Sequence, residues 1–383
     1  MRRRRTILAA LATLGLLLTA RPTAALERVL HTVERQLVEH AGEIVLEDRA
    51  GGVVLRTPSD QLHVIPAAQV RNRSTDDRPF ELLDAKGLAE ELLKELPADF
   101  RVHHSKNYVV CYNTTAAYAK WCSSLLERLQ KGFVSYWKKR GCEVAAPQRP
   151  LPVIVFSDEA SYLQHAVPEL GASARNVIGY YSMATNRIIM YDLTGAQAVV
   201  RGFSNSGSRA DIVSLLTLPA AEPLVATIVH EATHQISFNC GLQKRFADNP
   251  VWMSEGLAEF FETPDLRSTR GWAGIGEVNS SRWELYQANE AAGRLLPFER
   301  IVGGDDVFRN PQTAVDAYAQ AWALTYFLVK WRQQEYVAYL QAIAAKPQLV
   351  EVKPAARLEE FRKHFGDLQQ LESEFQRQMS RIR

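Results

Sequence analysis

The segment His230-Glu231-Ala232-Thr233-His234 constrains the folding of this chain more than any other. In an α-helix, residues i and i+4 lie about 40° apart around the axis and about 6 Å along it, so the two imidazoles face one point. Two nitrogens at about 2.0–2.1 Å can then hold one zinc ion. Glu231 lies one step around the same helix, where a carboxylate can reach a water on the metal and act as a general base. The segment therefore predicts a helix that carries two metal ligands and a base.

The flanks of the segment indicate where this helix begins and ends. Pro223 is tolerated in a first helical turn, so we expect the helix to begin near Ala221 or Glu222, and Gly241 can end it. The alternative is a surface helix that carries two histidines by chance. With nine histidines in 383 residues, at most about 0.02 such matches are expected, which favours the metal site.

A second segment, Trp252-Met253-Ser254-Glu255-Gly256-Leu257-Ala258-Glu259, offers a third ligand. A catalytic zinc ion keeps three protein ligands and one open position, and two histidines with a carboxylate form one of the known sets. We expect a helix that starts around Met253 or Ser254, with Ser254 as its cap and Glu255 near its beginning. Gly256 would let a neighbouring backbone approach closely.

Two further carboxylates compete for roles at this site. Glu259 lies one turn after Glu255 on the same helix face, which suits a hydrogen bond to a ligand histidine. A solvated helix face is the alternative for Glu259, and it is the favoured interpretation for Glu262.

The two segments, H-E-x-x-H and W-x-x-E-G-x-A-E, resemble the signature of gluzincin metallopeptidases, including the thermolysin-like and aminopeptidase groups. This resemblance implies that His230, His234 and Glu255 bind one zinc ion and that Glu231 is the catalytic base. More narrowly, the chain resembles exported bacterial proteins of the peptidase-MA-like group that carry the domain of unknown function 1570. That resemblance implies no substrate. The segments that carry this resemblance span about residues 100 to 365 and include 177–181, 186–192, 270–272 and 318–322.

The resemblance also implies an α+β, zincin-like fold over residues 79–383: a mixed-sheet subdomain, the H-E-x-x-H helix and a helical C-terminal subdomain. Hydrophobic patterning agrees, with strands expected at 106–113 and 151–156 and an amphipathic helix of about 115–140 between them. Residues 178–183 and 187–193 suggest a hairpin. In zincins the strand that borders the cleft pairs with extended substrate, and Arg187 to Leu193 is our candidate; a wholly paired inner strand is the alternative.

Residues 26–78 read as a small β-rich accessory module. We expect a short helix followed by strands, with 43–47 and 52–56 on either side of an Arg-Ala-Gly-Gly turn. The polar stretch from Asn72 to Pro79 could be the linker that leaves this module.

Residues 1–25 have the pattern of a signal peptide. Arg2 to Arg5 precede an apolar stretch, Ile7 to Leu18, and small residues follow up to Ala25, so cleavage is expected before Leu26. An uncleaved anchor is the alternative. We therefore expect an exported protein, periplasmic or extracellular, with no membrane insertion after cleavage.

The charge of the mature chain argues against a nucleic-acid partner. The whole chain carries a formal charge of +2, and the signal peptide contains five arginines and no acid, so its removal leaves −3. A near-neutral chain without a basic, aromatic strip does not have the composition of a nucleic-acid-binding protein.

Four cysteines, at 111, 122, 142 and 240, permit disulfides in an exported protein. If Thr114 or Thr115 caps a helix that runs to about Arg140, a bridge from Cys122 to Cys142 would have to span about 30 Å, so this pairing is disfavoured. Buried free thiols remain an alternative. Cys240 lies off the ligand face and is not expected to bind the metal.

Several residues could border the cleft. The composition of 194–209 predicts a flexible surface loop or a lid, and 271–276 a turn-rich loop at the rim. Tyr318, Trp322, Thr325 and Val329 recur at helical spacing, which indicates a core helix. Tyr318 is nevertheless our candidate for stabilising the oxyanion formed in amide hydrolysis. We expect His103 and His104 to lie at the edge of a strand and not to bind the metal.

These observations predict an exported zinc metallopeptidase that acts on a peptide or protein substrate. One zinc ion would activate water, with Glu231 as general base. The alternative is a non-catalytic envelope binding or scaffold protein with the same fold. The sequence leaves the substrate, endo- or exo-cleavage and the oligomeric state open.

Overall fold

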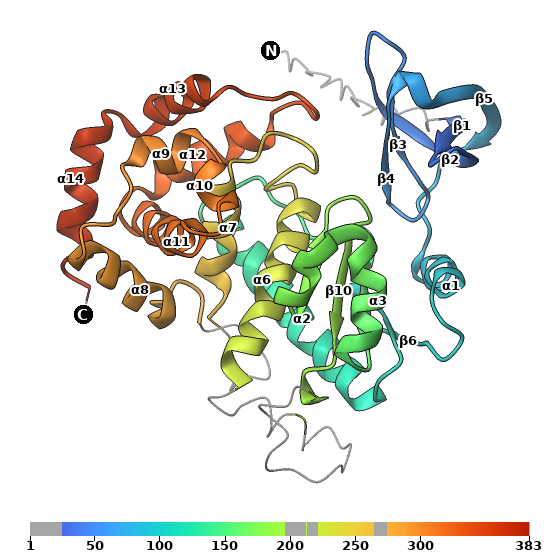
Figure 1. Cartoon of the computed structure of the whole chain (residues 1–383), viewed down its shortest axis with the longest axis horizontal. Coiled ribbons are helices and arrows are strands. Elements are labelled where there is room, and N and C mark those ends of the chain that lie inside the picture. Colours follow the sequence, from blue (N-terminus) through green and yellow to red (C-terminus); the bar gives the residue numbers. More distant parts are fainter. Residues whose placement is uncertain (1–24, 196–211, 213–220, 264–273, 383) are drawn as a thin grey trace, which may run out of the picture. The chain divides into compact units, whose positions relative to one another are not determined.

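The computed structural model describes residues 25–195, 212, 221–263 and 274–382. These residues form two compact units, shown in Figure 1. The first unit contains 25–58 and 63–82, and the second contains 59–62 and the described residues from 83 onward. The predicted signal peptide lies outside the described residues except for Ala25.

The first unit is a five-stranded sheet in the order β4-β3-β2-β1-β5. Glu34 and Arg35 both have positive φ, +47° and +69°, and form the two-residue turn between β1 and β2. A small core on the inner face contains Val29, Val53, Leu55 and Ile65. The strands are β1 (Ala25–Val33), β2 (Gln36–Glu47), β3 (Val53–Arg56), β4 (Leu62–Ile65) and β5 (Val70–Pro79), with a short 3₁₀ helix, η1 (Ala67–Gln69).

Two expectations for this unit were wrong. The short helix expected after residue 26 is strand β1, because its backbone pairs with β2 on one side and β5 on the other. The linker expected at 72–79 belongs to β5, whose polar side chains are mostly exposed while its backbone pairs with β1. The strands expected at 43–47 and 52–56 are confirmed by β2 and β3.

The second unit begins with a mixed sheet in the order β6-β7-β8-β10-β9. β7, β8 and β10 are parallel, whereas β6 and β9 pair antiparallel at the two edges. The predicted strands, the helix between them and the hairpin around 184–186 are confirmed. The strands are β6 (Arg101–His104), β7 (Tyr108–Tyr112), β8 (Leu151–Phe156), β9 (Gly179–Ser182) and β10 (Arg187–Tyr191).

Helices cover both faces of this sheet. Alternate residues of β7 divide between two cores: Val109 packs with one helical layer and Val110 with the other. The first layer contains α1 (Ala85–Glu95), α3 (Glu159–Leu170) and the 3₁₀ helix η2 (Gly171–Asn176). The second contains α2 (Ala116–Lys138) and α6 (Glu222–Asn239). The helix that carries the histidines therefore lies against a rigid sheet.

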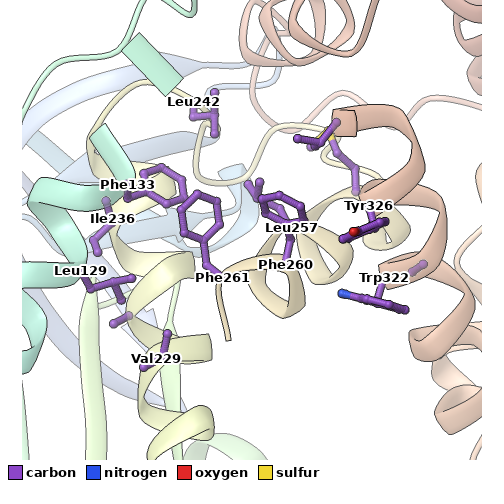
Figure 2. Packing of buried hydrophobic residues seen from close by; sticks show 14 of the residues in the cluster. Leu129, Phe133, Val229, Ile236, Leu242, Leu257, Phe260, Phe261, Trp322 and Tyr326 are labelled. Carbon is purple, nitrogen blue, oxygen red and sulfur yellow. The ribbon is translucent and has the colours of Figure 1, made fainter. Parts of the chain in front are cut away.

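The C-terminal half of the second unit is helical and packs around α11, in which every residue from Ala319 to Val329 is buried. Figure 2 shows how α7 lies between two neighbours: Phe261 packs on Phe133 of α2, and Phe260 faces Tyr326 of α11. Trp322, Thr325 and Val329 are buried, which confirms the core helix predicted from their spacing. The helices are α7 (Val251–Phe261), α8 (Ser280–Ala291), α9 (Phe298–Gly303), α10 (Asp306–Arg309), α11 (Ala314–Trp331), α12 (Gln333–Ala344), α13 (Pro354–Phe365) and α14 (Leu368–Met379), and η3 (Leu193–Gly195) is a short 3₁₀ helix after β10.

The described residues thus form a mixed α+β protein with a β-rich N-terminal unit. Within them, no helix combines the length and the apolar character needed to cross a bilayer. All four cysteines are buried free thiols. Thr115 caps α2 as expected, by accepting a hydrogen bond from the backbone N of Tyr118.

Candidate metal centre

The first motif lies on α6, whose boundaries follow the sequence prediction. The helix begins at Glu222 with Pro223 in its first turn and ends at Asn239. Gly241 has φ +90°, a backbone conformation that glycine adopts without strain, so it ends the helix as expected. His230 and His234 are therefore held in the middle of a long, mostly buried helix.

The second motif lies on α7, which begins earlier than expected. The helix starts at Val251 after Pro250, so Ser254 is not its cap but lies in the first turn. The backbone N–H of Val251 donates to Asp305 Oδ1 at 3.2 Å, so this carboxylate has the capping role that we expected of Ser254. The Ser254 hydroxyl instead accepts a hydrogen bond from Gln243 Nε2 at 3.0 Å.

Gly256 places α7 directly against α11, as its position after Glu255 suggested. A Cβ atom at Gly256 would lie 2.3 Å from Thr325 Oγ1 and 2.5 Å from the carbonyl oxygen of Ala321. Because a backbone oxygen cannot move aside cheaply, only glycine fits here. The close approach fixes the packing of α7, which carries Glu255, on α11.

The two helices bring His230, His234 and Glu255 together. His230 Nε2 lies 3.1 Å from Glu255 Oε2 and 3.2 Å from His234 Nε2, and His234 Nε2 lies 3.5 Å from Glu255 Oε1. Ligands at about 2.05 Å from a tetrahedral zinc ion are about 3.3 Å apart. The three donors are thus spaced as ligands of one small cation, and their ligand atoms lie within 4.8 Å of one another.

The electrostatics of this group favour positive charge. Burial alone would lower the pKa of His230, but hydrogen bonds to Glu255 and Glu262 raise it well above the ordinary value. Burial alone would raise the pKa of Glu255, but the two histidines lower it strongly. The group therefore stabilises a cation between two imidazoles and a carboxylate.

The carboxylate that orients a histidine is Glu262, not Glu259. His230 Nδ1 and Glu262 Oε2 lie 3.2 Å apart, so the ring can donate its second N–H to this carboxylate. Such a bond fixes the tautomer and directs Nε2 toward Glu255 and His234. The solvated face expected for Glu262 was therefore wrong; its side chain is 15% exposed.

Glu259 is fully buried and pairs with an arginine that the sequence did not single out. Arg282 Nε lies 3.0 Å from Glu259 Oε1, and Arg282 Nη2 lies 4.0 Å from Glu262 Oε2. Asn279 caps α8 and so positions Arg282 near the start of that helix. Arg282 thus contacts both carboxylates behind the histidines, and no motif or spacing in the sequence indicated it.

Glu231 lies beside the ligands, as the helix geometry predicted. Its Oε2 accepts a hydrogen bond from the backbone N of Tyr181 at 2.7 Å. Burial raises the pKa of Glu231, the two histidines oppose this shift, and Glu255 adds to it. The carboxylate is therefore fixed between α6 and β9, next to the three donors.

A cleft of about 640 Å³ opens over this group. Strand β9 forms one border, with Tyr180 and Tyr181, and Arg282 and Tyr318 also line the cleft. The prediction that 187–193 borders the cleft was wrong: β10 is an inner strand paired on both sides, and β9 is the edge. Because β10 pairs parallel with β8, its hairpin partner is left outermost.

The comparisons with known proteins concern the segment that holds this site. Residues 224–350 match the model of a family described as a protein of unknown function, DUF1570. The match covers about a third of the chain, from α6 to beyond α12. It includes the three donors, Arg282 and Tyr318. No curated protein matches the chain.

The remaining sequence predictions concern two loops, the His103-His104 pair and Cys240. The lid or loop expected at 194–209 lies outside the described residues from 196 onward, and so do 271–273 of the rim loop. His103 Nε2 and Ser123 Oγ lie 3.0 Å apart, within the second unit, and neither belongs to the donor group. Cys240 ends α6 and its thiol lies near the carbonyl of Ser237.

Proposed function

We propose that the chain is an exported zinc metallopeptidase with a zincin-like fold and a gluzincin-type site. The observation that carries the proposal is the spacing of His230, His234 and Glu255, 3.1–3.5 Å apart, with the Glu231 carboxylate beside them. A purely structural site would not require this carboxylate, because structural zinc is held by four protein ligands.

The donor set fits one zinc ion. Two imidazole nitrogens and one carboxylate oxygen leave a position open, which is the composition of catalytic sites. Zinc, when bound, would polarise a peptide carbonyl and lower the pKa of a water to about 7. The pairing of Glu262 with His230 Nδ1 would keep the Nε2 lone pair directed at the ion.

Glu231 would serve as general base and then as general acid. It would take the proton from the attacking water and pass it to the leaving amine, so one carboxyl group acts twice. The Tyr181 amide restricts its rotation, which keeps the carboxylate beside the reacting atoms.

The cleft supports a peptide or protein substrate in an extended conformation. Strand β9 is a sheet edge along the cleft, so its backbone could pair with a substrate strand. Tyr318 remains the candidate donor to the oxyanion, because its side chain lines the same cleft. The near-neutral charge of the mature chain gives no reason to expect a nucleic-acid substrate.

The test compares the wild-type chain with Glu231→Gln in a peptide-library digest, with and without a chelator. We expect chelator-sensitive cleavage by the wild type, and an inactive variant that still holds about one zinc ion per chain. Glu284→Gln, on the exposed side of α8, is the matched control and should cleave normally. Cleavage by the Glu231 variant would refute the mechanism. A zinc-loaded wild type that cleaves nothing would favour the non-catalytic scaffold.

A further inference from the structure

A second group of histidines lies in the first unit, far along the sequence from the metal centre. His31 Nε2 and His40 Nδ1 lie 2.8 Å apart, and the His40 ring stacks on His63 with centroids 3.9 Å apart. His31 is 4% exposed, and its Nδ1 is buried without a hydrogen-bond partner. We refer to His31, His40 and His63 as the imidazole cluster.

Sheet register brings the imidazole cluster together. His40 on β2 lies directly opposite Val29 of β1, and His31 lies two residues further along β1 on the same face. His63 comes from β4, on the far side of β3 in the strand order. Three separate strands thus contribute one ring each, so the position of every ring depends on the intact sheet.

The cluster is not arranged as a metal site. A separation of 2.8 Å between His31 Nε2 and His40 Nδ1 is that of a hydrogen bond, shorter than the roughly 3.3 Å between two ligands of one zinc ion. The lone pairs of an imidazole lie in the ring plane, and the rings of His40 and His63 are only 26° from parallel. Their lone pairs therefore do not converge on one point.

No described carboxylate forms a hydrogen bond or ion pair with His31 or His40. Most charged residues on the neighbouring strands bond to one another or to a threonine, Asp77 on β5 is exposed, and His63 is the one titratable residue of β4. The pairs are Arg28 with Glu39 and Asp76, Arg56 with Glu43, and Arg73 with Glu47, while Arg71 donates to Thr32 and Glu27 accepts from Thr75. A proton taken up by His31 or His40 would thus meet no carboxylate bonded to either ring.

We propose that the imidazole cluster is an acid-sensitive switch: when His31 and His40 both take up protons, their mutual repulsion separates β1 from β2 and opens the first unit locally. At neutral pH the rings share one hydrogen bond and one stack. Two protonated rings at this separation repel, and a protonated His31 would bury an unpartnered N–H.

The direction of the pH effect follows from the histidine pKa values. Burial lowers the pKa of His31, and burial together with the neighbouring His31 lowers the pKa of His40. The opened unit, where the rings have their ordinary pKa of about 6.5, then binds more protons than the closed one. The contribution of the cluster to stability is full above about pH 6.5 and is lost as the pH falls below it.

Hydrogen exchange on the full chain tests the proposal. Between pH 7.5 and 5.0, after correction for intrinsic exchange rates, protection of the β1 and β2 amides should fall by about tenfold or more. Protection of β7 and β8 in the second unit should change much less. His40→Gln, which removes the central ring, should abolish the fall. His104→Gln on β6, an exposed histidine, is the matched control and should not.

Equal loss of protection in His40→Gln and the wild type would overturn the proposal, as would constant protection in the wild type. A second measurement needs no variant. In assigned ¹³C-edited spectra of the intact chain, the imidazoles of His31 and His40 should titrate below the ordinary range, together with the opening of β1 and β2. Titration of both rings at ordinary values would also overturn it.

Discussion

The two histidine groups of this protein contain the same side chain but treat positive charge in opposite ways. In the second unit, carboxylates surround His230 and its pKa is raised. In the first unit, His31 and His40 contact other imidazoles and no described carboxylate, and their pKa values are lowered. The acidic neighbours, more than burial, therefore decide whether clustered imidazoles attract a cation or repel a proton.

The two groups also differ in the structure that builds them. Helical spacing alone places His230 and His234 on one face, and α7 then supplies Glu255. The imidazole cluster depends on three strands in register. The spacing of His230 and His234 depends on α6 alone, so small shifts of neighbouring elements do not change it. The spacing of the imidazole cluster changes whenever its strands move.

The largest difference between the groups should appear in zinc affinity. Replacing His230 or Glu255 with glutamine removes one of the three proposed ligands, and each ligand of a four-ligand zinc site accounts for roughly 3 kcal/mol or more. We expect zinc binding to weaken by over about a hundredfold, measured by competition with a chromophoric chelator.

His40→Gln is the matched control for that experiment, because it removes an imidazole from the other group. Its zinc affinity should stay within about twofold of the wild type. A loss in His40→Gln with unchanged affinity in His230→Gln and Glu255→Gln would mean that the first unit, not the second, holds the ion.

A smaller effect should follow from Arg282→Met, which changes no ligand. Without the guanidinium, Glu259 loses its partner at 3.0 Å and Glu262 loses the nearby positive charge that helps to hold it against His230. Loss of such an outer partner weakens metal binding about 10- to 100-fold. The readout is zinc affinity, with Arg294→Met, an exposed arginine beside α8, as control.

Unchanged zinc affinity in Arg282→Met would show that Glu262 keeps its position unaided. In that case the role of Arg282 would be confined to compensating the buried Glu259.

The donor group was predictable from the sequence because it depends mainly on local geometry. The i and i+4 spacing predicted that His230 and His234 lie on one helix face. The glycine after Glu255 predicted the close approach of α7 to its neighbour. The boundaries of α6 followed from Pro223 and Gly241, which act within one turn.

Two features could not be predicted from the sequence, the carboxylate that bonds to His230 and the identity of the edge strand, because both depend on how separate elements pack. Glu259 and Glu262 lie four and seven residues after Glu255, and both fall within about 40° of it around the helix. Which of them reaches His230 is set by where α6 crosses α7, and local spacing holds no information on that. The edge strand is a similar case: either strand of the β9–β10 hairpin could have paired with β8.

The smallest effect concerns the stack of His40 on His63. A double-mutant cycle with His40→Ala and His63→Ala, measured by exchange of the β2 amides, isolates the coupling between the two rings. At pH 7.5 an aromatic pair of this kind contributes about 0.5–1.5 kcal/mol, so the coupling should be favourable. At pH 5.0 repulsion between protonated rings should reduce it to zero or reverse its sign. A coupling that is equal at both pH values would show that the stack is only packing. The two histidine groups would then differ in their affinity for a metal ion but not in a response to acid.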